Sequence, residues 1–382
     1  MLQFDQEKPI GNLYKITNKL GSGSFGEVFK GVNMETNELV AIKLESQEAQ
    51  MPQIKHEFQI LSAIQGNGIP KVHWFGQWED KTVMVMELLG YNLEQLFNLV
   101  NRRFELKTML MLIDQMIDII SLLHSRGYLY RDIKPENFLM GINKKYSIIY
   151  IIDFGLSKKY KDKKTGEHIP YKENKGLIGT ARYVSLNTHL GIGMLIHLNE
   201  EQSRRDDMES LGYLWLYCLK GSLPWQGLDV NNREEKYELI KTIKQTISIE
   251  DLCHGLPNEF VKYFQHCRQL KFDEEPDYKR FKMLFRDLFF KLDFIWDYQF
   301  DWIESLQQEQ IQSIMHTKYS KNSLSSLKGG SQILKTDEED EVQEKIEFKI
   351  GGDSQINQKN VKPMLNLDKL ISKPNLFESI FK

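Results

Sequence analysis

Residues 130–137 read Tyr-Arg-Asp-Ile-Lys-Pro-Glu-Asn, and residues 153–155 read Asp-Phe-Gly. The passage between them includes Ser-Ile-Ile-Tyr-Ile-Ile at residues 147–152, which favours a strand, so we expect two neighbouring polar loops that can share one ligand. Asp132 precedes Asn137 by five residues, which lets a carboxylate face a substrate hydroxyl while an amide oxygen reaches a metal ion. The aspartate of Asp-Phe-Gly can hold the same metal against phosphate oxygens. Each residue alone could be a solvated loop residue, but together they indicate a magnesium-nucleotide site.

The composition is that of a folded protein with no bulk charge. At 382 residues, the chain is long enough for two packed lobes and an appendage, at about 150 residues per domain. Hydrophobic residues make up 41% of it, which is enough for a sizeable core. A net charge of −3 does not favour binding to nucleic acid or a membrane surface, so we expect neither as a partner and expect anions to be recognised locally.

The cysteines and the apolar segments bear on the compartment. Cys218, Cys253 and Cys267 are odd in number and widely spaced, which is typical of reduced thiols in the cytoplasm or the nucleus. Residues 1–7 carry acids and no long apolar run, so no signal peptide is expected. The most apolar long stretch, residues 110–123, is interrupted by acids at helical spacing, which predicts an amphipathic core helix rather than a membrane span.

A glycine-rich loop lies near the N-terminus. Gly21-Ser22-Gly23-Ser24-Phe25-Gly26 stands between β-favouring passages at residues 14–16 and 27–30, and a third such passage follows at residues 39–44. Dinucleotide-binding folds use the same glycine spacing, but there the last glycine opens a helix. Here β-favouring Val28 follows almost directly. We therefore expect a hairpin whose backbone amides can fold over phosphate groups.

A helical pattern follows these strands. It begins at Pro52 and places one apolar face at Ile54, Phe58, Leu61 and Ile64. Glu57 of this helix is the acid best placed to reach Lys43 on the preceding strand. Taken alone, Glu57 could be a solvated surface acid, but with Lys43 upstream an ion pair is favoured.

A change of pattern near residue 90 suggests a hinge. An apolar strand, residues 83–89, ends at Gly90, and Asn92 then opens a helix. A hinge between two lobes needs such a linker, with exposed backbone groups that can meet an adenine edge. An ordinary core strand followed by a helix cap would have the same composition.

The remainder of the chain is mainly helical and ends in a polar tail. Helices are predicted at residues 107–124, 208–219, 236–246, 257–270 and 278–292. After Trp302 the composition shifts to Gln, Ser, Lys, Asn and acids, so residues 303–382 are predicted to be a low-complexity, mostly disordered tail.

These motifs, in this order and spacing, resemble those of eukaryotic protein kinases, and residues 10–302 resemble the casein kinase I family in particular. The motifs that carry the narrower resemblance are GSGSFGEV at residues 21–28, NFLMG at 137–141, GTARYVSLNTHLGI at 179–192, QSRRDD at 202–207 and LPWQG at 223–227.

The resemblance implies an α+β, bilobal protein-kinase fold. After an N-terminal extension at residues 1–13, the kinase domain would span residues 14–302. Its small β-rich N-lobe with one main helix would cover residues 14–88, and its larger, mainly α-helical C-lobe residues 91–302. The implied activity is that of a serine/threonine kinase, which transfers the γ-phosphoryl group of ATP to acidic or already phosphorylated proteins.

The resemblance also assigns roles to individual residues. It implies Asp132, Lys134 and Asn137 as catalytic residues, with Asp132 accepting the proton of the substrate hydroxyl. Asn137 and Asp153 would be the ligands of Mg²⁺. The residues that would bind ATP are Gly21, Ser22, Gly23, Ser24, Phe25, Gly26, Val28, Ala41, Lys43, Glu57, Met86, Glu87, Leu89 and Asp153.

Two basic clusters would recognise the anion on the substrate. The resemblance assigns the first to Arg182 and Lys236, helped by the backbone near Gly227. It assigns the second to Arg131, Lys158 and Lys175. A guanidinium group and an ammonium group that converge on one point bind phosphate more strongly than a single carboxylate.

The sequence departs from the family pattern at several points. Tyr130 stands where many kinases have histidine, a position that packs and forms hydrogen bonds rather than transferring the proton. Residues 193–200 are an insertion, which could be a surface loop, a contact for a partner or substrate, or an error in the gene model. Residues 232–236 dilute the basic stretch that the family uses for nuclear import.

Two further expectations concern the state of the protein. We expect a monomer located in the cytoplasm, with the nucleus as a second compartment. Ser323, Ser325 and Ser326 of the tail could inhibit the kinase once phosphorylated, by occupying the first basic cluster. The alternative is a kinase-fold scaffold that is weakly active or inactive, but Lys43, Glu57, Asp132, Asn137 and Asp153 are all present.

Overall fold

The computed structural model describes residues 8–23, 26–46, 52–162, 164–171, 178–190, 201–230 and 232–307. The chain separates into two units with a break after Trp302, and the elements below all belong to the first unit. Several parts of the chain on which predictions were made lie outside the described residues. They are Ser24, Phe25, Lys175, the insertion at residues 193–200 and most of the polar tail.

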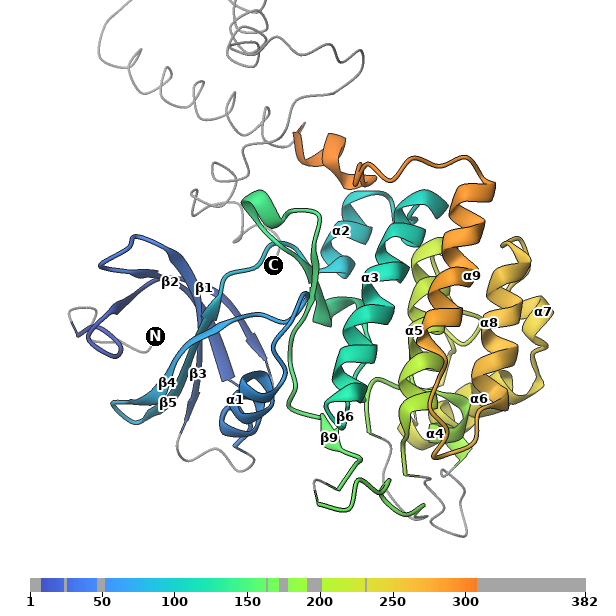
Figure 1. The fold of residues 1–382 in the computed structure, drawn as a ribbon, viewed down its shortest axis with the longest axis horizontal. Coiled ribbons are helices and arrows are strands. Elements are labelled where there is room, and N and C mark those ends of the chain that lie inside the picture. The colour runs from blue at the N-terminus through green and yellow to red at the C-terminus, as the bar shows by residue number, and fades with distance from the viewer. Residues whose placement is uncertain are drawn as a thin grey trace, which may run out of the picture. The chain divides into compact units, whose positions relative to one another are not determined.

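The N-terminal part of the described chain is an antiparallel sheet. Its strands are β1 (Tyr14–Gly23), β2 (Gly26–Asn33), β3 (Leu39–Ser46), β4 (Val72–Trp78) and β5 (Lys81–Glu87), in the spatial order β1-β2-β3-β5-β4. Figure 1 shows this sheet and helix α1 on one side of the domain and the other helices on the opposite side. The hairpin expected from the glycine-rich loop is present, since Gly23 pairs with Gly26.

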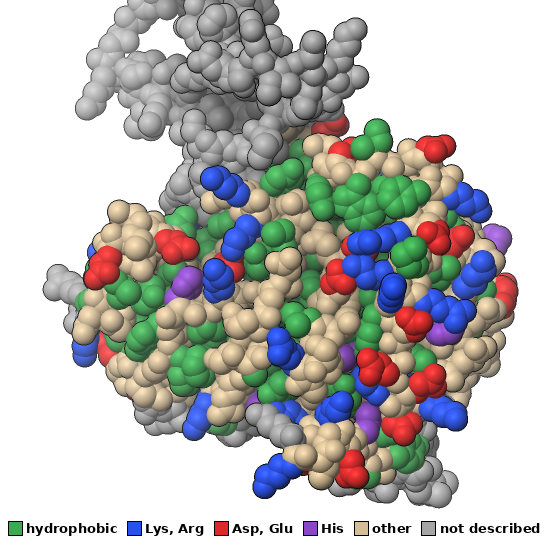
Figure 2. Space-filling view, viewed as in Figure 1, with side chains coloured by type: hydrophobic (Ala, Val, Ile, Leu, Met, Phe, Trp, Pro, Cys, Tyr) green, Lys and Arg blue, Asp and Glu red, His purple; other side chains and the backbone are tan. Residues whose placement is uncertain are grey.

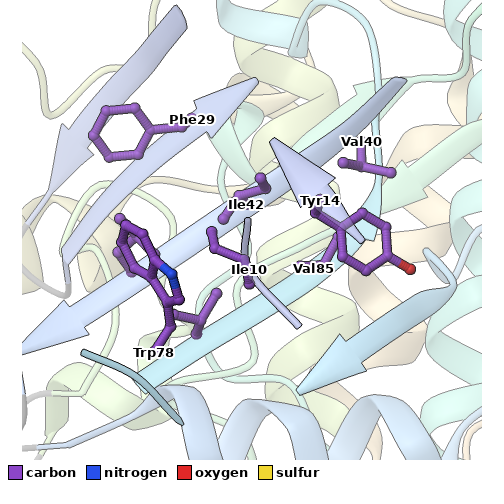
Figure 3. Close-up of a cluster of buried hydrophobic side chains, with 9 residues drawn as sticks. Ile10, Tyr14, Phe29, Val40, Ile42, Trp78 and Val85 are labelled. Carbon is purple, nitrogen blue, oxygen red and sulfur yellow. The ribbon is translucent and has the colours of Figure 1, made fainter. Parts of the chain in front are cut away.

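The two faces of the sheet differ in character because side chains alternate along each strand. Ile42, Val85 and Phe29 point to one face and join a buried apolar cluster with Ile10 and Trp78 (Figure 3). The other face carries Val28, Ala41, Lys43 and Met86, because Val28 pairs with Lys43 and Ala41 pairs with Met86 across the strands. One face of the sheet therefore builds the core, and the other holds the residues that were predicted to meet ATP.

Helix α1 (Ile54–Ala63) follows β3 and begins two residues after the predicted start at Pro52. The carboxylate of Glu45 in β3 accepts hydrogen bonds from the backbone N–H groups of Gln53, at 2.7 Å, and Ile54, at 3.4 Å. A side chain from a neighbouring strand thus takes the place of a local N-cap, which explains why the start of the helix carries no capping residue of its own.

The C-terminal part of the domain is helical. Its longer helices are α2 (Leu93–Leu99), α3 (Leu106–Ser125), α5 (Arg204–Lys220), α6 (Arg233–Thr246), α8 (Asn258–Gln269) and α9 (Tyr278–Lys291), and α4 (Leu186–Leu190) and α7 (Ile249–Leu252) are short. Helix α5 is the centre of this part, since Arg205 and Lys220 alone among its residues are not buried. It packs against α3 and α8, and α3 packs against α9 (Figure 1).

The predicted start of α5 at residue 208 was wrong by one turn, because the helix begins at Arg204. The polar residues Arg204, Asp206 and Asp207, which precede the predicted start, are buried and paired. The Asp206 carboxylate accepts a hydrogen bond from the Ser203 backbone N–H at 2.7 Å, and Arg204 donates to the Asp273 carbonyl at 2.5 Å. Helix α6 likewise begins before its predicted start, at Arg233, where the Asn232 side chain caps it.

Two small sheets lie between the N-terminal sheet and the helices. Strand β6 (Tyr128–Leu129) pairs with β9 (Lys158–Lys159), and β7 (Phe138–Met140) pairs with β8 (Ile149–Ile151). Only β8 was predicted. These pairings bring the loops at residues 130–137 and 153–155 side by side.

The surface carries no large area of one charge on the face shown in Figure 2, where blue and red side chains are interspersed. This agrees with the net charge of −3. Within the described residues, no helix has both the length and the apolar character needed to cross a bilayer.

The apolar face of the N-terminal sheet gives a stability prediction. Ile42 is completely buried, so Ile42→Ala should lower the free energy of unfolding by about 2–5 kcal/mol through lost contacts and a cavity. Met34, which is 46% exposed, provides the control: Met34→Ala should change it by less than about 0.5 kcal/mol. Urea unfolding measures both, and equal effects would contradict the assignment of this face to the core.

Candidate active site

Asp207, in the first turn of α5, fixes the loop that contains Asp132. Its Oδ2 accepts a hydrogen bond from the Tyr130 backbone N–H at 2.8 Å, and its Oδ1 accepts one from the Arg131 backbone N–H at 2.8 Å. The Nε2 atom of buried His124 lies 2.9 Å from the same Oδ2. Since α5 is buried almost throughout, the loop is attached to the core of the helical part of the domain.

Three side chains donate to the carboxylate of Asp132. Lys134 Nζ lies 2.6 Å from its Oδ2, and Asn137 Nδ2 donates to the same oxygen at 3.1 Å. The Thr180 hydroxyl donates to Oδ1 at 3.1 Å. With 5% of its surface exposed, Asp132 is held in one orientation, and three residues from two segments of the chain define it.

Two residues of this region adopt the left-handed backbone conformation although neither is glycine. Arg131 has φ 70° and Asp153 has φ 61°. Such a conformation costs free energy for most L-residues and persists where the surroundings impose it, often at functional sites. At Arg131 the Asp207 hydrogen bond supplies that constraint. Tyr130, the residue before Arg131, supplies a second constraint. Its hydroxyl donates to the Ile152 carbonyl at 2.6 Å and so ties the two loops together.

Lys43 and Glu57 form the ion pair that joins β3 to α1. Their Nζ and Oε2 atoms are 2.5 Å apart, and the Glu57 side chain is only 2% exposed. Burial opposes the charged form of Lys43, but Glu57 and Asp153 outweigh this and raise its pKa above the ordinary value. Lys43 is therefore a cation that interacts with two acids, Glu57 of α1 and Asp153 of the Asp-Phe-Gly loop. The His56 Nε2 atom, 2.9 Å from the Ser157 carbonyl, also links α1 to the segment after that loop.

The glycine-rich hairpin leaves space above this face of the sheet. At Gly21 an added Cβ would meet no atom within 4 Å, so its backbone is open to a ligand. At Gly26, with φ +126°, a Cβ would lie 2.1 Å from the Leu44 carbonyl oxygen. Only glycine fits there, and it holds the hairpin close to β3.

The predicted hinge follows β5 directly. Met86 and Leu89 are both 8% exposed. Glu87 is turned away into polar contacts, since it forms an ion pair with Lys145 and accepts a hydrogen bond from the Lys71 backbone N–H at 3.2 Å. Within the described part of the chain, the Leu89 backbone takes part in no hydrogen bond, whereas the Gly90 N–H donates to the Met140 carbonyl at 2.8 Å. The backbone of Leu89 is thus the part of the hinge that can pair with an adenine edge.

The residues expected to hold Mg²⁺ supply a suitable but incomplete donor set. The Asn137 amide nitrogen faces Asp132, which directs its carbonyl oxygen the opposite way. The Asp153 carboxylate accepts only a long hydrogen bond of 3.3 Å, from the Gly155 N–H. Among the described residues no group of three or more His, Cys, Asp or Glu side chains could hold a metal ion. One amide and one carboxylate fit Mg²⁺, which binds few protein oxygens and completes its shell with phosphate oxygens and water.

The residues of the first basic cluster lie on three separate segments. The Arg182 guanidinium group lies 5.5 Å from the Tyr217 ring centroid, and its Nη1 atom donates to the Tyr183 hydroxyl at 3.3 Å. Lys236 is exposed on the first turns of α6, and Gly227 has φ +68° in the loop before that helix. The structure shows Arg182 held in place by aromatic rings, whereas Lys236 projects freely into solvent.

The second basic cluster contains an acid that was not predicted. Lys158 Nζ lies 2.8 Å from an oxygen of Glu201, whose side chain is 3% exposed. Burial lowers the pKa of Arg131, and the nearby Glu201 and Asp207 oppose that shift. Two cations of the cluster therefore already share an internal carboxylate. Lys175 lies outside the described residues.

The interactions of Asp207 give a second prediction. Asp207→Asn would place an amide N–H₂ group against backbone N–H donors, so a buried donor would lose its acceptor. The free energy of unfolding should fall by about 1–3 kcal/mol. As a matched control, Asp277 caps α9 by accepting the Arg280 N–H at 2.9 Å, and asparagine caps equally well. In urea unfolding, Asp277→Asn should leave stability near wild type, and an equal loss in both variants would contradict the anchoring role.

Comparison with protein-family models places this geometry in a known group. The model described as protein kinase domain matches residues 14–284. The match covers the N-terminal sheet, the glycine-rich hairpin, both polar loops and the helices up to α9. It accounts for the occurrence of Lys43 together with Asp132, Asn137 and an Asp-Phe-Gly loop, and it implies the use of ATP. The chain belongs to the protein kinase family.

Proposed function

We propose that this protein is a serine/threonine kinase of the casein kinase I type, which phosphorylates acidic or already phosphorylated proteins. The observation that carries the proposal is the arrangement around Asp132, where Lys134, Asn137 and Thr180 all donate to its carboxylate. Asp132 is thus a fixed acceptor with a cation beside it.

In the proposed reaction the substrate hydroxyl donates its proton to Asp132 as its oxygen bonds to the γ-phosphorus. The bond from that phosphorus to the β,γ-bridging oxygen breaks, and ADP leaves. Lys134 lies 2.6 Å from Asp132, where it can stabilise the negative charge of the transferred group. Lys43, fixed by Glu57, would hold the α- and β-phosphates.

Mg²⁺, when bound, would supply positive charge that neutralises the negative charge developing on the phosphates. Asn137 and Asp153 would be its protein ligands. The left-handed conformation of Asp153 sets the direction of its carboxylate before any nucleotide arrives. Orientation of this kind lowers the barrier, because the groups need not reorganise during the reaction.

The ATP site would use the second face of the N-terminal sheet. Val28 and Ala41 provide apolar surface next to Met86, and the backbone of Leu89 provides the polar edge for adenine. The proposed binding residues are those expected from the family: Gly21, Ser22, Gly23, Ser24, Phe25, Gly26, Val28, Ala41, Lys43, Glu57, Met86, Glu87, Leu89 and Asp153.

Arg182 supports the proposed preference for acidic or phosphorylated substrates. Burial opposes its charged form, but Tyr183, Tyr217 and Glu136 outweigh this and raise its pKa, so it is a cation held at a fixed place. It lies two residues after Thr180, which contacts Asp132. A substrate anion a few residues from the target hydroxyl could therefore meet Arg182, with Lys236 and the Gly227 backbone as further partners. Because Glu201 partly neutralises the second cluster, we propose the first as the principal anion site.

The alternative function is a scaffold that keeps the kinase fold but turns over little or no substrate. Loss of one of the five residues that bind nucleotide or act in the reaction would favour it. All five, Lys43, Glu57, Asp132, Asn137 and Asp153, are present, and the first four make the hydrogen bonds described above. This favours the enzyme.

Asp153→Asn tests the activity itself. The variant should keep the fold, because the side chain is only partly buried and makes one weak hydrogen bond. It should lose at least about a hundredfold in the rate of phosphate transfer from labelled ATP to casein, since a metal ligand has lost its charge. Thermal unfolding checks the fold. A purified, folded variant with wild-type activity would overturn the proposed role of Asp153.

Paired peptides test the substrate preference. A peptide with phosphoserine three residues before its target serine should have a kcat/KM about tenfold above that of the unmodified peptide, as expected for about 1.4 kcal/mol from charge-assisted hydrogen bonds. In Arg182→Ala/Lys236→Ala this ratio should approach one.

The control is Lys262→Ala, which removes an exposed lysine of α8 and should preserve the wild-type ratio. Serine, threonine and tyrosine at the target position of the same peptide test the acceptor. A wild-type ratio near one would contradict the anion site, and preferential transfer to tyrosine would contradict the serine/threonine assignment.

A further inference from the structure

Lys244 is a completely buried lysine in the last turn of α6, with 0% of its surface exposed. Its Nζ atom donates to the carbonyl oxygen of Val184 at 2.6 Å and to that of Ala181 at 3.2 Å. Lysine is among the residues that are most rarely buried, and it is buried only where its charge has partners. None of the roles described above uses this side chain.

Two aromatic rings as well as the two carbonyl oxygens surround the Nζ atom of Lys244. Nζ lies 4.7 Å from the ring centroid of Tyr213 and 4.8 Å from that of Trp225. Burial lowers the pKa of Lys244, and nearby Glu209 opposes this. Glu209 is itself engaged by Arg268, 3.2 Å away. Two ring faces and two carbonyl dipoles favour the ammonium form in such an environment.

Packing alone does not account for a lysine at this position. A methionine has nearly the same length and would fill the space without the cost of removing an ammonium group from water. What methionine cannot do is donate hydrogen bonds to the two carbonyl groups. The property specific to lysine here is therefore its hold on the backbone at Ala181 and Val184.

Other donors hold the same stretch of backbone from the same side. Trp225 Nε1 donates to the Arg182 carbonyl at 2.8 Å, and His189 Nε2 lies 3.0 Å from the Ala181 carbonyl. Burial, together with Lys244, lowers the pKa of His189 to about 3, so its ring is neutral and Nε2–H can donate. The carbonyl groups of residues 181, 182 and 184 thus all point into the C-terminal lobe.

The side chains of this stretch serve the proposed substrate site. The Thr180 hydroxyl contacts Asp132, and Arg182 carries the principal anion-binding group. Lys236, the second cation of the first basic cluster, lies on the same helix as Lys244, about two turns earlier. Lys244 thus connects α6, which carries Lys236, to the backbone of the segment that carries Arg182.

We propose that Lys244 is a positioning residue for the protein substrate: it fixes the backbone of residues 180–184 against α6, and so sets the place of Arg182 relative to Asp132 and Lys236. The identity of the substrate anion rests on the proposed function. The effect on peptide binding does not, because residues 180–184 lie beside Asp132 whatever the substrate carries.

Lys244→Met tests the proposal in the full-length protein. The KM for a serine peptide should rise about tenfold because the segment loses its fixed position, whereas the KM for ATP should stay within twofold of wild type. Lys244→Gln, which keeps a hydrogen-bond donor without the charge, should recover part of the peptide affinity. Lys220 is the matched control, since its Nζ also donates to a carbonyl, that of Leu252 at 2.9 Å, but far along the chain from this segment. Lys220→Met should leave both constants unchanged.

A general structural role would change other quantities. If Lys244→Met melts near the wild-type temperature and its peptide KM is unchanged, or if both KM values rise together, the proposal is wrong. If that variant does not fold, Trp225→Phe decides: it removes one donor to residues 181–184 and keeps an aromatic ring over Lys244, so its peptide KM should rise selectively, and a wild-type value would overturn the proposal. The kcat/KM of wild type for the phosphoserine peptide, divided by that for the unmodified peptide, is measured alongside. This ratio separates failure of the anion site from failure of this proposal.

Discussion

The two hydrogen bonds from the loop backbone to Asp207 are the constraint on which the site depends. They attach residues 130 and 131 to a helix that is buried on all sides, and so force Arg131 into a conformation that it would otherwise seldom adopt. The direction in which the chain leaves Arg131 decides where Asp132 points. Lys134, Asn137 and Thr180 then only have to meet a carboxylate whose place is already given. Asp207, a buried acid in α5, thus defines the geometry of the loop that contains Asp132.

Much of this arrangement could be predicted from local sequence. Strand alternation places Val28, Ala41 and Lys43 on one face, because the side-chain period of a strand is two and the pairing of β2, β3 and β5 is in register. The side-chain period of a helix likewise places Glu57 on the part of α1 that can reach Lys43. The glycine hairpin followed from its β-favouring flanks. In each case the residues concerned are close in sequence or belong to regular elements, so a repeat of known period predicts their relative position.

The remaining contacts depend on how distant segments pack, and no local period encodes that. Thr180 reaches Asp132 across 48 residues, and Lys244 reaches Val184 across 60. Glu201 meets Lys158 only because the strand β9 and the segment before α5 lie side by side. The start of α5 was missed by one turn because Arg204 and Asp207, polar residues before the apolar run, are buried with partners from other elements. Polar residues just before an apolar helix are ambiguous in sequence, because a loop and a capped, fully buried helix start look alike.

Gly179 shows how closely the loop at residues 130–137 and the segment at residues 179–184 approach each other. It has φ +99°, and an added Cβ would lie 2.5 Å from the Arg131 carbonyl oxygen. The two backbones are therefore in direct contact at this point, with no side chain between them. Position 179 is consequently restricted to glycine both by its own positive φ and by the loop across from it. Any other residue there would push the backbone of the loop that holds Asp132 away from the segment that holds Thr180 and Arg182.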